Sequence, residues 1–380
     1  MSDTGSRIYR WRVLTTPALA PPAIEQPAPR QASYGLVTGL AARGTRRIVV
    51  SSRGHVLADA KLRGRRFSLR VDLPTGDLTL RVATLDEHGR PAASVVREVF
   101  GLPRTARPRL AGSHEDPALA RRIRHLARSF HGTSGIYVQN LTDGAGAAWN
   151  ASARFPAAST LKLAIATTVL ASYHGVPPPG SYVDDLLRRM IAYSDNASAN
   201  ALEVWLGGST SAGGAKVDGL MHSVGLRDTI MYGGYELGTF ARRIPVRAEE
   251  QPSFGTGKYT TASDLSRLLR AVWLASGGRG PLHANAFTTA DGRYLLWLLG
   301  HVQDAPKLDR ILGRGNGLAV LHKAGWIDAA RNDAGLVFWR GGVFVASVMT
   351  WRSGGAGISS DVLAGRCAAV ALARFRVLRG

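Results

Sequence analysis

The chain of 380 residues is 45% hydrophobic and 20% charged, which is typical of a globular protein with room for more than one core. No run of about 18 apolar residues occurs, so the sequence predicts no membrane-spanning helix. The formal net charge of +21 favours anionic partners, such as an acidic wall polymer, an anionic lipid or a nucleic acid, unless it reflects only a solvated basic surface. The single cysteine, Cys367, excludes an intramolecular disulfide.

The first 33 residues are rich in Pro, Ala and Arg and lack hydrophobic periodicity, so we predict a disordered lead over residues 1–33. They contain no apolar core of about 7–15 residues, and therefore we recognise no signal peptide there.

Residues 34–103 are predicted to form a small antiparallel β-sandwich of immunoglobulin-like type. Short segments of alternating polarity recur there, and turn signals such as PTGD at residues 74–77 separate them. The segments are 46–52, 66–73, 78–85 and 94–101.

Positive charge is concentrated at the start of the chain. The first 112 residues contain 19 Lys and Arg but only 8 Asp and Glu, which is more than half of the total surplus. This distribution predicts either adhesion to an anionic cell-wall polymer or a basic spacer without a partner.

The rest of the chain, residues 113–380, has strand-like runs at both ends and helical patterns between and outside them. This order predicts an α/β domain in which helices flank one antiparallel sheet. The strand-like runs are a hairpin over 135–151 and three segments at 318–327, 334–342 and 343–351; the outer helices are predicted at 116–131 and 359–375.

The run FPAASTLKL, residues 155–163, places Ser159 and Lys162 at the head of an apolar stretch long enough for a buried helix. Residues three apart share a helix face, and a lysine that loses its charge on burial can act as general base for a serine nucleophile. Free N–H groups at such a helix start stabilise an oxyanion. The alternative is a helix-capping serine beside a snorkelling lysine, because S-x-x-K is common by chance.

Two further segments favour catalysis. The run YSDNASAN, residues 193–200, presents Ser194 and Asn196 on a turn between two helical patterns, where an ordinary loop is the alternative. The run HKAGW, residues 322–326, ends a strand-like segment and combines the positive charge of Lys323 with a glycine that permits close backbone approach.

The three motifs, in this order, resemble those of the serine β-lactamase and penicillin-binding-protein superfamily, which are S-x-x-K, S-D-N and K-T-G. The resemblance covers residues 113–380 and is greatest to class A β-lactamase-related serine hydrolases. The motifs here are STLK at 159–162, SDN at 194–196 and KAG at 323–325.

The resemblance implies a role for each residue of the motifs. Ser159 would attack a carbonyl to form an acyl-enzyme, and Lys162 would take its proton. Ser194 would relay a proton to the leaving nitrogen, Asn196 would hold the substrate amide, and Lys323 would orient Ser194 and attract a substrate carboxylate. Gly325 would allow the substrate to approach the backbone closely, and the oxyanion hole would be formed by the N–H groups of Ser159 and Trp326.

Two departures from the family pattern bear on turnover. Ala324 replaces a hydroxyl residue that would bond the substrate carboxylate, which removes an interaction worth about 1.5–3 kcal/mol. The E-x-x-L-N string that supplies the deacylating glutamate in class A enzymes is absent, and the best positional candidate is Glu236, for which a loop glutamate is the alternative.

We therefore predict a serine hydrolase that acts on β-lactams or peptidoglycan-derived amides without metal or cofactor, and that binds no nucleic acid. A penicillin-binding peptidase or esterase is the near alternative, and a catalytically weak wall-binding protein is the distant one. By resemblance, the protein is expected to act outside the cytoplasm, in the cell envelope or secreted.

Overall fold

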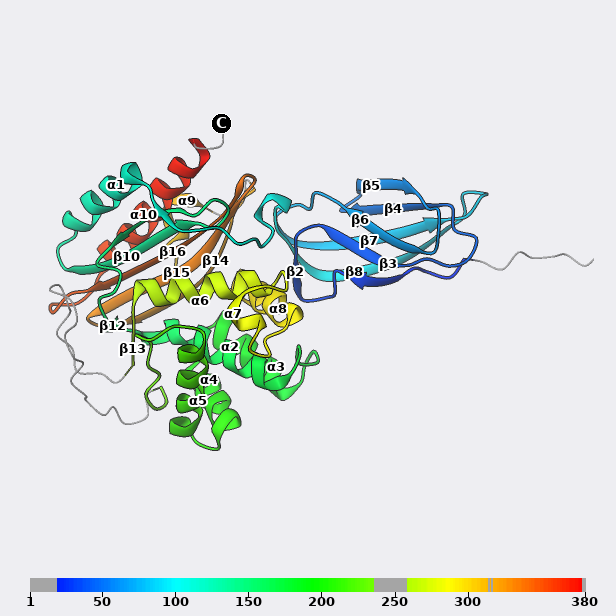
Figure 1. Cartoon of the computed structure of the whole chain (residues 1–380). Helices are drawn as coiled ribbons and strands as arrows, with labels where there is room; N and C mark the ends of the chain where they lie inside the picture. The colour runs from blue at the N-terminus through cyan, green and yellow to red at the C-terminus, as the bar shows by residue number, and fades with distance from the viewer. Residues whose placement is uncertain (1–18, 236–257, 314, 316, 378–380) are drawn as a thin grey trace, which may run out of the picture.

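The computed structural model describes residues 19–235, 258–313, 315 and 317–377. Figure 1 shows an all-β part, which contains the strands β1 to β8, beside a larger part in which helices flank a sheet. The predicted α/β fold with an all-β part before it is therefore confirmed at this level, while the immunoglobulin-like type stays a prediction.

The all-β part is a sandwich of two sheets with the strand orders β1-β3-β6 and β2-β8-β7-β4-β5. The inward-facing residues of both sheets, including Ile48, Phe67 and Leu80, share one core. The strands are β1 (Ala23–Gln26), β2 (Gln31–Ser33), β3 (Leu36–Leu40), β4 (Arg47–Ser52), β5 (His55–Lys61), β6 (Arg66–Arg70), β7 (Gly76–Leu85) and β8 (Pro91–Gly101).

The prediction of a disordered lead is wrong for its last third, because β1 and β2 both lie within residues 1–33. The backbone of β1 pairs antiparallel with β3, and that of β2 pairs parallel with β8. Strands of four and three residues are too short to show a periodicity, and their order comes from these backbone pairings. Residues 1–18 lie outside the described residues.

The larger part contains a six-stranded sheet with the order β14-β15-β16-β10-β11-β9. The predicted antiparallel pairing is confirmed for five strands, whereas the edge strand β9 (His114–Glu115) runs parallel to β11. The others are β10 (Thr133–Asn140), β11 (Ala145–Trp149), β14 (Ala319–Ile327), β15 (Ala330–Trp339) and β16 (Gly342–Trp351); β12 (Phe155–Pro156) and β13 (Tyr259–Thr260) form a separate pair.

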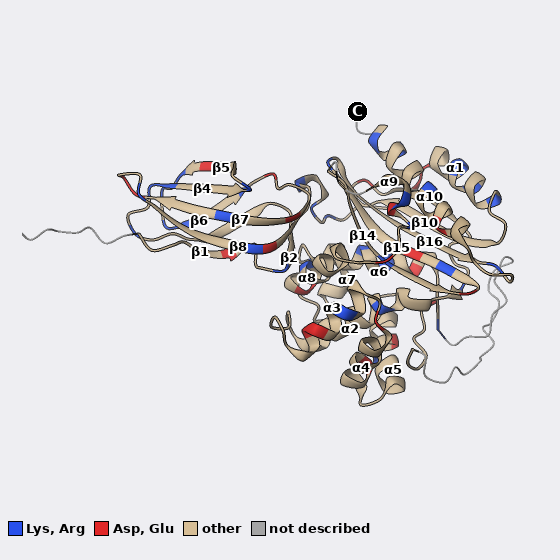
Figure 2. Ribbon diagram, turned by 180° about the vertical axis from the view of Figure 1, so that it is seen from behind, with Lys and Arg blue, Asp and Glu red and all other residues tan. Residues whose placement is uncertain are grey.

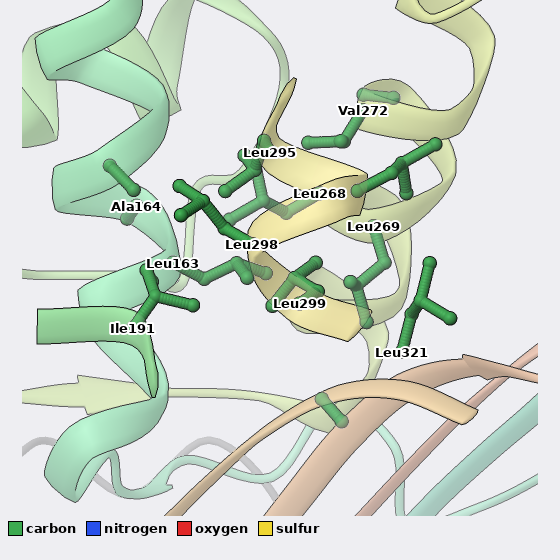
Figure 3. Packing of buried hydrophobic residues seen from close by; sticks show 14 of the residues in the cluster. Leu163, Ala164, Ile191, Leu268, Leu269, Val272, Leu295, Leu298, Leu299 and Leu321 are labelled. Carbon is green, nitrogen blue, oxygen red and sulfur yellow. The ribbon is translucent and has the colours of Figure 1, made fainter. Parts of the chain in front are cut away.

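Each face of this sheet has its own core. The terminal helices α1 (Pro117–Arg128) and α10 (Ile358–Val377) cover one face, and Asp116 caps α1 by accepting hydrogen bonds from two of its N–H groups. Helices α2, α6 and α8 pack toward the other face, where leucines interdigitate as Figure 3 shows. The helices on this side are α2 (Lys162–Tyr173), α3 (Tyr182–Ala192), α4 (Asn196–Gly207), α5 (Thr210–Ser223), α6 (Ala262–Ala275), α7 (Gly280–His283) and α8 (Thr289–Gly300), whereas the short α9 (Asp309–Leu312) packs against α10 on the first face.

The sandwich is joined to the α/β part by buried contacts. Arg30 forms an ion pair with Asp184 of α3, and the Tyr34 hydroxyl lies 3.0 Å from the Ser276 hydroxyl. Between the two parts, Ala106 accepts a hydrogen bond from the Trp273 indole at 2.9 Å. These contacts fix the sandwich on the side of α3 and α8 (Figure 1).

Among the described residues, no helix combines the length and the apolar character that crossing a membrane requires.

Candidate active site

Ser159 lies in a short 3₁₀ turn, η2 (Ala158–Leu161), that leads directly into α2. Lys162 is the first residue of α2, its side chain is fully buried, and its Nζ lies 3.1 Å from Ser159 Oγ. Helix α2 is buried along ten of its twelve residues, so the helix start is held inside the protein. The serine and the lysine are thus in direct hydrogen-bond contact at a buried helix start.

The second motif, residues 194–196, also contacts Lys162. Lys162 Nζ donates to the backbone oxygen of Ser194, lies 3.3 Å from Ser194 Oγ and donates to Asn196 Oδ1 at 2.5 Å. Ser194 has φ of 58°, in the left-handed region that a non-glycine residue rarely adopts. Asp195 caps α4 by accepting from Ser198 N at 2.8 Å. The cap fixes the turn that presents Ser194 and Asn196 to Lys162.

Lys323 has a different set of partners from the one that the resemblance implies. Its Nζ donates to Asp304 Oδ2 at 2.7 Å and to the Ala324 oxygen at 3.0 Å, and none of its hydrogen bonds goes to Ser194 in the described part of the chain. Burial lowers the pKa of Lys323, and the Asp304 carboxylate opposes this shift. A fully buried ammonium requires a counter-charge, which Asp304 supplies and a serine hydroxyl would not.

Gly325 brings β14 against the turn that carries the nucleophile. A Cβ atom at this position would lie 2.6 Å from Ser159 N and 2.7 Å from Thr160 N, which is too close for any side chain. The next residue, Trp326, is 62% exposed at the end of the strand. The third motif thus provides close packing at Gly325 and an accessible aromatic surface at Trp326.

Tyr235 is a component of the site that the sequence motifs do not reveal. Its ring centroid lies 4.6 Å from Lys162 Nζ, and its hydroxyl donates to the Ala158 oxygen at 3.2 Å. Asn200 fixes its backbone through two hydrogen bonds of 2.9 and 2.7 Å. Burial raises the pKa of Tyr235 well above its ordinary value, so the hydroxyl stays neutral. Its one sequence signal was its position beside Glu236.

Glu236 lies outside the described residues. Two other polar residues near the third motif have structural partners: Arg331 forms a bidentate ion pair with Asp361, and His322 lies 2.9 Å from both oxygens of Asp333. Burial alone would lower the pKa of His322, but the attraction of Asp333 raises it.

A comparison with models of known protein families agrees with the family that the sequence motifs indicate. The model described as "Beta-lactamase enzyme family" matches residues 118–175 and 173–364, which is well over half of the chain. The chain belongs to this family. The match begins within α1 and leaves the sandwich outside it.

Solved structures share the fold at low identity. PBP-A is 20% identical, with a TM-score of 0.56 over 70% of this chain and 100% of its own. The β-lactamase of Streptosporangium roseum is 22% identical, with a TM-score of 0.53 over 69% and 100%. The class A β-lactamase of Mycobacterium abscessus is 18% identical, with a TM-score of 0.52 over 68% and 99%. No curated protein sequence matches the chain.

Proposed function

We propose that this protein is a serine hydrolase that opens β-lactams or related amides through an acyl-enzyme on Ser159. The observation that carries the proposal is the contact of 3.1 Å between Ser159 Oγ and the fully buried Nζ of Lys162. A neutral amine has two hydrogens and one lone pair. Lys162 Nζ contacts the Ser194 oxygen and Asn196 Oδ1 as well as Ser159 Oγ, and in its neutral form it would take the serine proton.

Acylation follows from this arrangement. Ser159 Oγ forms a bond to the carbonyl carbon while its proton passes to Lys162 Nζ. The C–N bond then breaks, and the nitrogen receives a proton through Ser194 Oγ, 3.3 Å from Lys162 Nζ. Asn196 and Lys323 attract the polar groups of the substrate.

Acyl-enzymes of this kind are hydrolysed rapidly or slowly, and Tyr235 favours slow hydrolysis here. A mutant of PBP-A is described as an acyl-enzyme complex with penicillin G. In this chain the neutral Tyr235 ring covers Lys162, and a neutral phenol does not activate water as a carboxylate would. The second candidate is therefore a penicillin-binding peptidase or esterase with a long-lived adduct. A base contributed by Glu236 would instead give a β-lactamase.

A fluorescent penicillin and a chromogenic cephalosporin separate these candidates. We expect covalent labelling that Ser159→Ala abolishes, and labelling of the Ser159→Ala variant would refute the mechanism. An adduct that persists supports the penicillin-binding protein, whereas rapid cephalosporin turnover supports the lactamase. The distant alternative, a catalytically weak wall-binding protein, would give neither.

The sandwich supports a separate role in binding an anionic wall polymer. Six exposed basic residues lie at one end of the sandwich, in loops and at strand ends. Two backbone hydrogen bonds hold these segments together: Leu62 N donates to the Arg46 oxygen, and Ala41 N donates to the Arg65 oxygen. Figure 2 shows positions of Lys and Arg in blue along the ribbon of this part. The residues of this basic end are Arg43, Arg46, Lys61, Arg63, Arg65 and Arg66.

Binding of this kind depends on salt, because exposed charges are screened over about 10 Å at 0.1 M ionic strength. Retention on beads carrying poly(glycerol phosphate) should therefore fall with added salt and with the double change Arg63→Glu and Arg65→Glu. Retention that neither treatment alters would refute this role. Binding to such a polymer would place the protein in the cell envelope, which is the location we propose.

A further inference from the structure

A cavity of about 740 Å³ lies between the sandwich and the α/β part. On the sandwich side it is lined by Arg53 and by residues of β7 and β8, including Thr79 and Glu98. On the other side it is lined by residues of α3, by the end of α8 and by Gln303. Its size is that of a site for a small molecule or for several residues of a peptide.

Two residues that line the cavity are direct sequence neighbours of residues of the candidate active site. Tyr193, which lines it, is 72% exposed and directly precedes Ser194. Gln303, which also lines it, directly precedes Asp304, the partner of Lys323. Gln303 N donates to the Ala192 oxygen at 2.8 Å, so the segment that carries Gln303 is bonded to the segment that carries Tyr193. The cavity therefore borders the two segments that carry Ser194 and Asp304.

The walls of the cavity are held in place before any ligand binds. Beyond the Arg30–Asp184 ion pair, His301 Nε2 lies 3.1 Å from Asp77 Oδ1 across the boundary, and the His301 ring packs edge-on against Phe100 at 6.1 Å. A preformed site avoids the free-energy cost of ordering its walls on binding.

The chemistry of the lining indicates the occupant. Arg188 and Arg189 of α3 and Arg53 of the sandwich supply positive charge, while Asp185 and Glu98 supply negative charge. Trp297 and Leu298 of α8 add apolar surface. Both signs of charge beside an apolar floor suit a peptide that carries carboxylate and ammonium groups.

We propose that this cavity is an extended subsite for the distal part of a zwitterionic peptide whose reactive end lies at Ser159. The inference rests on the proposed acyl transfer and assigns the sandwich a part in substrate selection. Selectivity for long substrates would then require both parts of the chain.

The test compares two thioesters with the same reactive end, a dipeptide and a pentapeptide that carries one Lys and one Glu at its distal end. In the full-length protein we expect kcat/KM to be at least about tenfold higher for the pentapeptide, which is the effect of one charge-assisted contact. Thr79→Trp, which fills the cavity from the sandwich, and Arg188→Glu, which reverses a charge on α3, should each reduce this ratio toward one. The control Arg121→Glu, an exposed charge on α1 outside the cavity, should leave the ratio unchanged. Equal ratios in wild type and both cavity variants would overturn the proposal.

A direct binding measurement separates this inference from the proposed function. Anisotropy of a dansyl-labelled pentapeptide amide is measured with the Ser159→Ala protein, in which no acyl transfer occurs. We expect the pentapeptide to bind at least about tenfold more tightly than the dipeptide, and Thr79→Trp to remove the difference. If neither thioester reacts but this difference holds, the acyl transfer is wrong and the subsite stands. If both peptides bind equally, the subsite is wrong whatever the chemistry at Ser159.

Discussion

The ion pair between Arg30 and Asp184 is the buried electrostatic link between the sandwich and helix α3. Arg30 Nη1 lies 3.0 Å from Asp184 Oδ2, and a second guanidinium nitrogen contacts the other oxygen. The side chains are 7% and 0% exposed. Asp184 also accepts from the Tyr294 hydroxyl and from Gly180 N at 2.9 Å. Replacing Arg30 with Met keeps much of the volume and removes the charge.

The expected loss in the free energy of unfolding depends on the partners that Asp184 keeps in this variant. Breaking a buried ion pair by removing one partner costs about 3–5 kcal/mol, because the other charge stays buried without compensation. The Tyr294 hydroxyl and Gly180 N still donate to Asp184, so we expect a value near the lower end, about 3 kcal/mol. For a domain of this size each kcal/mol lowers Tm by about 2–4 °C, which gives a decrease of about 6–12 °C.

Differential scanning calorimetry of Arg30→Met against wild type measures this decrease. Adding Asp184→Asn to Arg30→Met should recover most of it, because the uncompensated charge is then gone. Arg47→Met provides the matched control, since the Arg47–Asp59 pair is exposed. If Arg30→Met lowers Tm no more than Arg47→Met does, the ion pair does not hold the sandwich in place.

Three further predictions concern the site and its surroundings. Gly325→Ala should slow penicillin acylation about 100-fold in stopped-flow fluorescence, because the added Cβ displaces the nucleophile turn. Asp304→Asn should lower the pKa of Lys323 further, so that the alkaline fall of acylation begins at lower pH than in wild type. Burial opposes protonation of His301, but its bond to Asp77 raises the pKa above the ordinary value. The resulting stabilisation is complete below about pH 6.5 and is lost as the pH rises through the raised folded value, so Asp77→Asn should lower Tm at pH 6 and not at pH 9.

Each of these has a control and a contrary outcome. Gly354→Ala adds a Cβ where no atom lies within 4 Å, so it should acylate like wild type, and equal rates for the two alanine variants would contradict the packing argument. Superimposable pH profiles for wild type and Asp304→Asn would show that Asp304 does not tune Lys323. A Tm loss in Asp77→Asn that is the same at both pH values would exclude His301 as the titrating group.

The sequence predicted the parts of this structure that depend on short-range patterns. The patterns indicated β4, β6, β7 and β8 of the sandwich and the strands β10, β11, β14, β15 and β16, but not β3 or β5. The S-x-x-K and S-D-N strings marked side chains that meet, and Gly325 of K-A-G packs against the same turn. The sequence did not predict β1 and β2, because their order comes from pairing with β3 and β8, and no local pattern indicates such pairing. The sequence did not indicate Tyr235 or Asp304 as site residues for a related reason. Tyr235 contacts Lys162, and Asp304 contacts Lys323, across more than a dozen residues of intervening chain, and neither lies in a motif.

The two buried lysines of the candidate site have different surroundings. Lys162 Nζ contacts oxygens of Ser159, Ser194 and Asn196, and the carboxylate of Asp195 in the same motif bonds to the α4 backbone. Lys323 instead bonds to the carboxylate of Asp304, which holds its proton against the effect of burial. We therefore propose proton transfer for Lys162, whose Nζ contacts the nucleophile, and attraction of a substrate anion for Lys323, which its carboxylate partner keeps charged.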